Sequence, residues 1–386
     1  MVIAGRLGPK KKTVEGRGFY ILLTGQFYSA NWVLAHLRPL AVSPLCEKIR
    51  IVSSYPVPEL PNLEVIRPPV AFARIFGATV ARLMMFVAVA IKSRPDVVGG
   101  FHLLLNGMLA ALVAKAVGAR SLYFCVGGPA EVLNGGLLSE NRLFEKLRRP
   151  DPKVEQSLLK IVSTFDAVIT MGSGAVRFFQ EKGVTAGFHI ISGGLDLKSF
   201  SPRSGPADFD LIFVGRLVPI KRVDLLLEAV RLVKSKFPDI SARVVGDGPL
   251  FQPLTEMSRR LGLEANIQFV GYQSDIASWL KRAKFFVLTS VSEGLSLAMM
   301  EAMASGLPAI VPDTGDLGDL VKDHVNGYLV REPSAKSYAG CISELLTDPD
   351  QLSRFSRSAR ASAERYSIAH ASGQWSRILE SKRQAA

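Results

Sequence analysis

Short apolar segments alternate with longer amphipathic ones along most of the chain. In the first half seven segments are predicted strands: FYILLTG (19–25), KIRIVSSY (48–55), LEVIRP (63–68), DVVGG (96–100), SLYFCVGG (121–128), AVITMG (167–172) and FHIISGG (188–194). Helical stretches lie between them, among them residues 71–93 and 106–118. This alternation is typical of parallel sheets built from strand–helix–strand units.

The second half repeats the pattern with a new set of strands. They are DLIFVGR (210–216), SARVVGDG (241–248), IQFVGY (267–272), FFVLTS (285–290), PAIVPD (308–313) and GYLV (327–330), with helices over 222–237 and 275–283. A chain of 386 residues suits two domains. The polar stretch 195–208 between the halves fits a linker, and we place the boundary near residue 198.

The predicted fold is therefore α/β, with two doubly wound Rossmann-like domains that face an interdomain cleft. We expect a basic flexible tail over 1–17, a first domain over 18–197, a second domain over 198–365, and a final helix over 366–386 that packs back on the first domain. Open parallel sheets bind ligands beyond the carboxyl ends of their strands. Residues that bind substrate or take part in catalysis are therefore expected in the loops that follow the strands.

Charge is distributed unevenly between the halves. The net charge is +13, of which residues 1–200 carry +11 and the remainder +2. A basic first domain indicates an anionic partner such as a phospholipid surface or a phosphorylated acceptor, although a scattered basic surface with no such partner is an equal alternative. Nucleic acid is not expected, because the charge lacks interleaved aromatic platforms.

One basic cluster lies beside apolar residues and could form a helix on lipid; it comprises Arg142, Lys146, Arg148, Arg149 and Lys153, with Leu143, Phe144 and Leu147. The longest apolar run, residues 83–91, is far shorter than the roughly 20 residues of a spanning helix. We expect this run to form a helix that packs on a sheet, and insertion of that helix into a membrane is the alternative.

The expected location is the cytoplasm, with the inner face of the cell membrane as a peripheral site. The first 18 residues lack the apolar region of a signal peptide. Cys46, Cys125 and Cys341 are odd in number and widely spaced, which favours buried reduced thiols over disulfides or a metal site.

The segment FVGRLVPIKRVD places two cations between a strand that ends at Gly215 and a helix that begins near Arg222. Arg216 and Lys221 are thus expected at a helix N-terminus, which is itself electropositive and disfavours cations. A bound diphosphate would compensate, since helix amides and both cations can bind its oxygens. The alternative is a pair of solvated surface cations.

The segment SVSEGLSLAMMEAMASGLP carries complete helix signals, because Ser296 can cap the start while Gly306 and Pro308 end it. Glu293 then precedes the helix and Glu301 lies on it. Gly294 allows backbone amides to approach a ligand closely. A carboxylate that accepts two hydroxyl hydrogen bonds is a common way to hold a sugar diol, so the two glutamates are candidates for binding two sugars.

This segment resembles the E-x7-E motif of glycosyltransferase family 4, a large family of retaining enzymes with the GT-B fold. The similarity extends to GRLVPIKRVDLLLEAV, to VVGDGPL, and to SGGLDLKSFSP, which resembles the family's interdomain N-G-V-D-x-x-x-F-x-P with Gly193 in place of the usual Asn. Together these motifs are specific for the family, whereas each of them alone is weak evidence for it.

The resemblance implies that residues 18–197 bind the acceptor and residues 198–365 bind the nucleotide sugar, and it implies roles for named residues. Arg216 and Lys221 would bind the donor diphosphate and Glu301 the nucleotide ribose. Glu293 and the amides of Gly294, Leu295 and Ser296 would hold the transferred sugar and the diphosphate. The strand end at Gly215 and the loop with Gly246 and Gly248 would line the donor pocket. His102, which follows a strand, would face the transferred sugar, whereas a lone histidine is more often structural.

The loop after the first strand departs from the family, which often has a Gly-Gly pair there. Here Gly25 stands alone, and Phe27, Tyr28 and Trp32 are candidates for an acceptor platform, with packing against the next helix as the alternative. Asp208-Phe209-Asp210 spells a D-x-D metal motif but precedes a strand, so no metal is expected.

The function implied by the resemblance is transfer of a hexosyl group, with retention, from a UDP- or GDP-sugar to a hydroxyl acceptor such as a lipid-linked or cell-surface glycan precursor. No cofactor beyond the donor is expected. Two alternatives stay open: a GT-B sugar-nucleotide epimerase, and a non-catalytic relative that binds glycan or lipid.

Overall fold

The computed structural model describes residues 17–27, 30–136 and 149–384. Within it the chain divides into two compact units. Unit 1 is formed by the chain up to Met171, by Ala175–Gly194 and by the chain from Ile368 onward. Unit 2 is formed by Leu195–Ser367 together with Gly172–Gly174.

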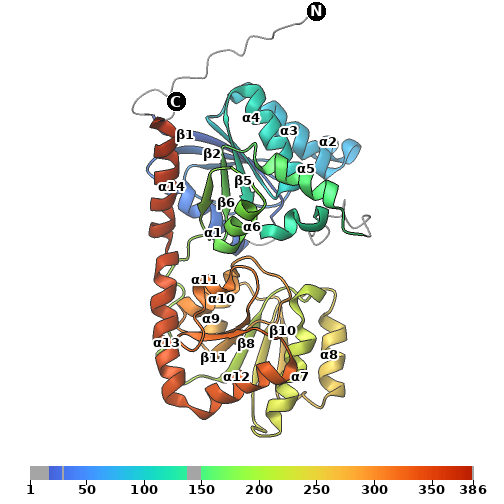
Figure 1. Ribbon diagram of the computed structural model, residues 1–386, viewed down its shortest axis with the longest axis vertical. Coiled ribbons are helices and arrows are strands. Elements are labelled where there is room, and N and C mark those ends of the chain that lie inside the picture. Colours follow the sequence, from blue (N-terminus) through green and yellow to red (C-terminus); the bar gives the residue numbers. More distant parts are fainter. Residues whose placement is uncertain (1–16, 28–29, 137–148, 385–386) are drawn as a thin grey trace, which may run out of the picture. The chain divides into compact units, whose positions relative to one another are not determined.

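Unit 1 is built on a parallel sheet with strand order β3-β2-β1-β4-β5-β6-β7 (Figure 1). The chain thus starts in the interior of the sheet, runs to one edge, returns to β4 beside β1 and continues to the other edge, which is the doubly wound topology. The strands are β1 (Phe19–Thr24), β2 (Cys46–Val52), β3 (Leu63–Ile66), β4 (Val97–Phe101), β5 (Arg120–Cys125), β6 (Ala167–Thr170) and β7 (Phe188–Ile190).

Helices cover both faces of this sheet. They are α1 (Ala30–Ala41), α2 (Val70–Phe76), α3 (Ala78–Ser93), α4 (Met108–Val117), α5 (Pro152–Val162), α6 (Ser173–Glu181) and α14 (Ile368–Gln384). Side chains of α3 and α4 share a core with Leu22 and Val98. On the other face α14 packs against α1, and its Trp375 meets the ring of Phe124.

Unit 2 contains a second parallel sheet of order β10-β9-β8-β11-β12-β13. Its strands are β8 (Phe209–Val214), β9 (Ala242–Val245), β10 (Ile267–Gly271), β11 (Ala283–Val287), β12 (Ala309–Pro312) and β13 (Gly327–Val330). Its helices are α7 (Val223–Lys234), α8 (Phe251–Arg260), α9 (Ile276–Leu280), α10 (Leu297–Ala304), α11 (Leu317–Leu320), α12 (Ala335–Thr347) and α13 (Pro349–Ala363). The predicted α/β class with two doubly wound sheets is confirmed.

One predicted helix is wrong in its extent. Residues 71–93 form two helices, α2 and α3, because Gly77 between them adopts φ 79° and ψ 149°, a conformation that ends the first helix. Among the described residues no single helix is both long and apolar enough to cross a membrane; α2 and α3 reach that length and composition only together, and the chain bends by 118° between them.

Several predicted features lie outside the described residues. They are the basic tail up to residue 16, and Arg142, Leu143, Phe144, Lys146, Leu147 and Arg148 of the basic cluster. Of that cluster, Lys153 stands in the first turn of α5, whose start is capped by Asp151. The cysteines are free thiols, with Cys46 and Cys125 buried and Cys341 half-buried.

Candidate functional site

Two loops that follow neighbouring strands are joined at the carboxyl edge of the unit 2 sheet. β8 and β11 lie side by side at the point where the strand order reverses, which is where open sheets bind ligands. The amide of Val291 donates to the carbonyl of Ile220 at 2.9 Å, and the Thr289 hydroxyl donates to the carbonyl of Lys221 at 2.9 Å. The loop after β8 therefore has a fixed position against the loop after β11.

The side chains of Lys221 and Glu293 meet across these joined loops. The Lys221 ammonium lies 2.5 Å from Glu293 Oε1, and the Ser290 hydroxyl donates to the same oxygen at 2.7 Å. Both side chains are mostly buried, 20% exposed for Lys221 and 10% for Glu293. The predicted diphosphate cation and the predicted sugar-binding carboxylate thus neutralise each other in the structure.

Glycines allow two further loops to pack directly on this pair of loops. Gly246, at φ 140°, follows β9, and a Cβ there would collide with the carbonyl oxygen of Gly215. Gly315, at φ 57°, follows β12, and a Cβ there would collide with the carbonyl of Glu293. Gly248 approaches the backbone of Leu217 in the same way. The sequence therefore uses glycine where four strand-end loops come into backbone contact.

Glu301 lies on α10, in the second turn of a helix that begins at Leu297, whereas Glu293 precedes the helix. Helix α10 begins where predicted, since the Ser296 hydroxyl accepts from the amide of Met299, and it ends before Gly306, which adopts φ 78°. Glu301 is only 5% exposed, and within the described ranges no hydrogen bond or ion pair reaches its carboxyl group. Burial alone raises its pKa to about 8.

The remaining predicted donor residues lie around this centre. Gly294 and Ser296 are half-buried and Leu295 is buried, all between Glu293 and α10. Lys221 lies in a 3-10 turn (Pro219–Lys221) immediately before α7. Arg216, in contrast, is exposed and lies two residues beyond β8 and seven before α7, so its expected place at a helix N-terminus is wrong. The loop between β8 and α7 is longer than a simple strand-to-helix turn.

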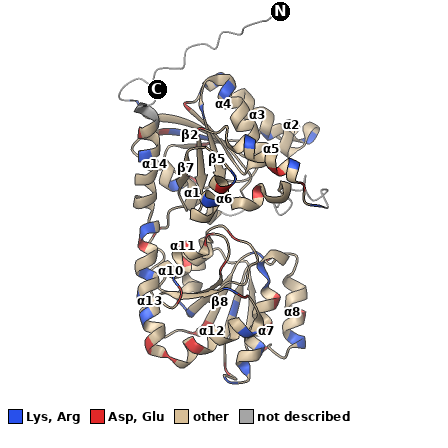
Figure 2. Ribbon diagram, viewed as in Figure 1, with Lys and Arg blue, Asp and Glu red and all other residues tan. Residues whose placement is uncertain are grey.

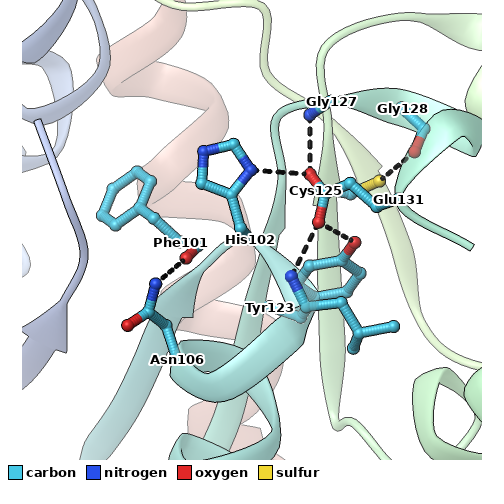
Figure 3. Close-up of polar contacts among 9 residues, drawn as sticks. Phe101, His102, Asn106, Tyr123, Cys125, Gly127, Gly128 and Glu131 are labelled. Carbon is cyan, nitrogen blue, oxygen red and sulfur yellow. Dashed lines mark hydrogen bonds and ion pairs between the residues drawn. The ribbon is translucent and has the colours of Figure 1, made fainter. Parts of the chain in front are cut away.

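A second polar centre, in unit 1, surrounds His102 at the carboxyl end of β4 (Figure 3). His102 has φ 64°, a conformation uncommon for residues other than glycine. Its amide donates to Phe124, and its carbonyl accepts from Gly107 at 2.9 Å. The imidazole is 47% exposed, and its Nδ1 lies 3.1 Å from Glu131 Oε1.

Glu131 is the residue of this centre that sequence reasoning missed. Its carboxylate accepts from His102 Nδ1, from the amides of Gly127 and Leu103 at 2.6 Å each, and from the Tyr123 hydroxyl at 2.8 Å (Figure 3). Burial favours a raised pKa, but the imidazole and the two amides outweigh it and hold the pKa of Glu131 below its usual value. An ionised carboxylate only accepts, so the proton of this contact is on Nδ1 of His102.

The predicted acceptor residues in the loop after β1 have different environments. Phe27 is 4% exposed and packs edge-on against Phe101, so its side chain belongs to the core. Trp32 is half-buried and stacks on His36, with ring centroids 4.1 Å apart. Gly25 has no room for a side chain beside Phe27 and Phe101. Tyr28 lies outside the described residues.

The acidic pair considered as a metal motif has other partners. Asp208 forms an ion pair with Arg282 at 2.6 Å, and Asp210 with Lys284 at 2.7 Å. In the part of the chain that the structure describes, no cluster of three or more histidine, cysteine or acidic side chains is arranged to hold a metal ion.

The two doubly wound units define the GT-B class of fold. HepE from Anabaena, solved with UDP-glucose, has a similar structure with a TM-score of 0.72 over 94% of this chain and 100% of that chain, at 19% identity. Sucrose-phosphate synthase from Thermosynechococcus elongatus aligns with a TM-score of 0.75 over 95% and 100%, at 17% identity. At these identities the likeness concerns the fold.

The match to a family model lies within unit 2. Residues 197–362 match the family model of glycosyl transferases group 1. The chain is 32% identical over 216 residues to D-inositol 3-phosphate glycosyltransferase of Rhodococcus erythropolis, covering 51% of this chain and 48% of that protein. It is 26% identical over 219 residues to an uncharacterised glycosyltransferase of Haemophilus influenzae, covering 56% and 62%. The chain thus spans about half the length of the curated relatives it matches.

Proposed function

We propose that this protein is a glycosyltransferase that moves a hexosyl group from a UDP- or GDP-sugar to a hydroxyl acceptor, with retention at the anomeric carbon. The family match of unit 2 and the names of the relatives support the class of activity. HepE, of the same fold, is solved with UDP-glucose, which supports a nucleotide-sugar donor. The E-x7-E resemblance supports assignment to family 4 and to the retaining group.

The observation that carries this proposal is the buried carboxyl of Glu301. A buried carboxylate without hydrogen-bond donors is costly to the fold, and its charged form becomes favourable when donors arrive. The two hydroxyls of a ribose supply such donors from a neutral ligand. We therefore assign Glu301 to the nucleotide ribose.

The Lys221–Glu293 pair serves the diphosphate and the transferred sugar. When a diphosphate binds, the Lys221 ammonium can exchange a carboxylate oxygen for a phosphate oxygen, since the two offer similar charge-assisted hydrogen bonds. That exchange frees Glu293 to accept from sugar hydroxyls. The ion pair thus holds the Lys221 ammonium and the Glu293 carboxylate in position before the donor binds.

Catalysis in this proposal is electrostatic. Lys221 and Arg216 stabilise the charge that grows on the departing nucleoside diphosphate, and the leaving phosphate takes the proton of the acceptor hydroxyl. The glycosidic bond to phosphate breaks as the new bond to the acceptor oxygen forms on the same face. No side-chain nucleophile is required.

The acceptor is assigned to unit 1, as a glycan or a lipid-linked precursor at the cytoplasmic face of an anionic membrane. His102 binds or polarises the transferred sugar through Nε2, and Glu131 is its positioning residue, because it fixes the tautomer and the ring orientation through Nδ1. Trp32, half-buried on α1 with its ring stacked on Phe27 and His36, remains the candidate for an acceptor platform.

The test is the turnover of Lys221→Ala with a UDP- or GDP-sugar and a hydroxyl acceptor. Removing one cation from the leaving group is expected to cost on the order of 3 kcal/mol of barrier, a loss of 10²- to 10³-fold in kcat. Arg259→Ala, which removes an exposed cation paired with Glu256 on α8, is the matched control and retains activity. Unchanged turnover in Lys221→Ala contradicts the assignment, and a product formed from donor alone would favour an epimerase.

A further inference from the structure

The outward side of α3 is apolar up to its last turn, where Lys92 is exposed. Phe86 and Ala90 are fully buried against the sheet. At helical spacing, the opposite side presents Val80, Met84 and Ile91, which are 47%, 45% and 62% exposed. A helix that is apolar on all sides is ordinarily covered by protein or by lipid. In the part of the chain that the structure describes, these three side chains stay exposed.

Helix α2 extends this apolar surface. It has no buried residue, and Val70, Ile75 and Phe76 are 69%, 74% and 46% exposed. α2 packs beside α3, and both lie with α4 on one side of unit 1 (Figure 1). We call the exposed set Val70, Ile75, Phe76, Val80, Met84 and Ile91 the α2–α3 face.

The charges around this face are of one sign. Residues 65–95 contain no aspartate or glutamate, and α2, α3 and α4 carry Lys and Arg but no acidic residue (Figure 2). The exposed cations are Arg67, Arg74, Lys92, Arg94 and, on α4, Lys115. Arg82 does not contribute, because it is buried and donates to the Thr24 hydroxyl. An apolar surface flanked only by cations is complementary to an anionic lipid bilayer.

A protein partner fits the same surface less well. Four of the six exposed residues are valine or isoleucine, whereas the residues that dominate binding energy at protein interfaces are mostly tryptophan, tyrosine and arginine. Pairing with a second copy about a two-fold axis would place the same cations opposite one another. Fluid acyl chains require no matched shape, and anionic headgroups neutralise the flanking charge.

We propose that the α2–α3 face docks on an anionic phospholipid bilayer, with its aliphatic side chains in the boundary between headgroups and acyl chains and its cations on the headgroups. This inference specifies the membrane surface in the proposed function and is independent of the transfer chemistry. A failed membrane experiment therefore leaves the donor assignment in place, and the reverse also holds.

The test is co-sedimentation of the full chain with vesicles of phosphatidylcholine alone and of phosphatidylcholine mixed with phosphatidylglycerol. Binding is expected only to the anionic vesicles, and it weakens as sodium chloride is raised. The double variant Ile75→Ser/Ile91→Ser should bind at least roughly tenfold more weakly. Arg74→Gln should weaken binding roughly fivefold, since each cation near an anionic surface is worth about that factor.

The control is Tyr272→Ser/Val325→Ser, which removes two equally exposed apolar side chains from unit 2, 71% and 54% exposed, and should bind as the parent does. Because all four positions are exposed, the variants retain their fold, which melting curves check. Equal binding to both vesicle types, or parent-like binding of Ile75→Ser/Ile91→Ser, would overturn the proposal. Concentration-dependent self-association that the same variant abolishes, without vesicle binding, would overturn it in favour of a protein interface.

Discussion

Glu131 in unit 1 and Glu301 in unit 2 are equally buried, at 4% and 5% exposure, yet they have opposite surroundings. Glu131 accepts from two amides, a phenol and an imidazole. Glu301 has no such partner in the part of the chain that the structure describes. Burial is the same for both carboxyls, so the difference in their pKa comes from the donors.

The pKa directions separate a carboxylate that serves the fold from one suited to a ligand. The donors around Glu131 lower its pKa and keep the group charged. The pKa of Glu301 is raised to about 8, so its charge has a cost that ligand hydroxyls can remove. The predictions below test whether the two glutamates differ in this way.

The largest effect is expected from Glu131→Leu. Loss of the carboxylate leaves buried amides and the Tyr123 hydroxyl without their acceptor, which should lower the free energy of unfolding of unit 1 by about 3–5 kcal/mol. Urea unfolding followed by intrinsic fluorescence measures it. Glu64→Leu is the control, since Glu64 is 44% exposed and pairs with Lys48 and Arg50, and it should cost under about 1 kcal/mol. A Glu131→Leu effect as small as the control's would contradict the structural role.

The next effect is expected from His102→Gln. If Nε2 acts on the transferred sugar, kcat should fall on the order of 10²-fold while the donor KM changes little. Initial rates at several donor concentrations give this separation. A rise in the donor KM with unchanged kcat would show instead that His102 contributes only to ground-state binding.

Glu301→Gln is expected to stabilise the ligand-free protein, by less than Glu131→Leu destabilises it. The folded state holds the Glu301 proton up to about pH 8, whereas the unfolded chain loses it near the ordinary carboxyl value. Glu301 therefore destabilises the parent increasingly as pH rises through that window, up to about 1–3 kcal/mol above pH 8. Glu301→Gln lacks this pH-dependent destabilisation. Its melting temperature should therefore exceed the parent's at high pH and match it near pH 4. A parent that is the more stable of the two at high pH would refute this.

The smallest expected effect is the release of a proton when the nucleotide binds. Ribose binding that favours the ionised Glu301 carboxyl should release close to one proton per nucleotide at pH 7, and affinity should rise with pH up to about 8. Calorimetry in buffers of different ionisation enthalpy measures the release. Glu301→Gln should release none, and equal release by both proteins would assign the proton to another group.

The strands were predictable because each is a short apolar run followed by a polar loop, although β8 and β11 end at Val214 and Val287, before the predicted ends at 216 and 290. The break at Gly77 was not, because the flanking residues continue an apolar helical pattern and the positive φ is a property of the folded backbone. Arg216 was misplaced although the strand end and the helix start were predicted closely, because residues 217–222 separate it from the start of α7.

The polar centres were only half predictable. Lys221, Glu293 and Glu301 stand in recognisable motifs, but the contact of Lys221 with Glu293 joins residues 72 apart on two loops, which only the sheet order brings together. Glu131 carried a weak signal, as the one acid in CVGGPAE beside two glycines. Its four donors come from β5 and from the segments that follow β4 and β5, and no spacing along the chain shows that they converge.

The central claim is that unit 2 binds a nucleoside diphosphate sugar through Glu301. The direct measurement is calorimetric titration of UDP and GDP into the parent, into Glu301→Gln and into Glu256→Gln, the last an exposed glutamate of the same unit. One nucleotide should bind the parent and Glu256→Gln alike, and bind Glu301→Gln roughly 10- to 100-fold more weakly, as expected for lost hydrogen bonds to a charged group. Equal affinity for the parent and Glu301→Gln would contradict it.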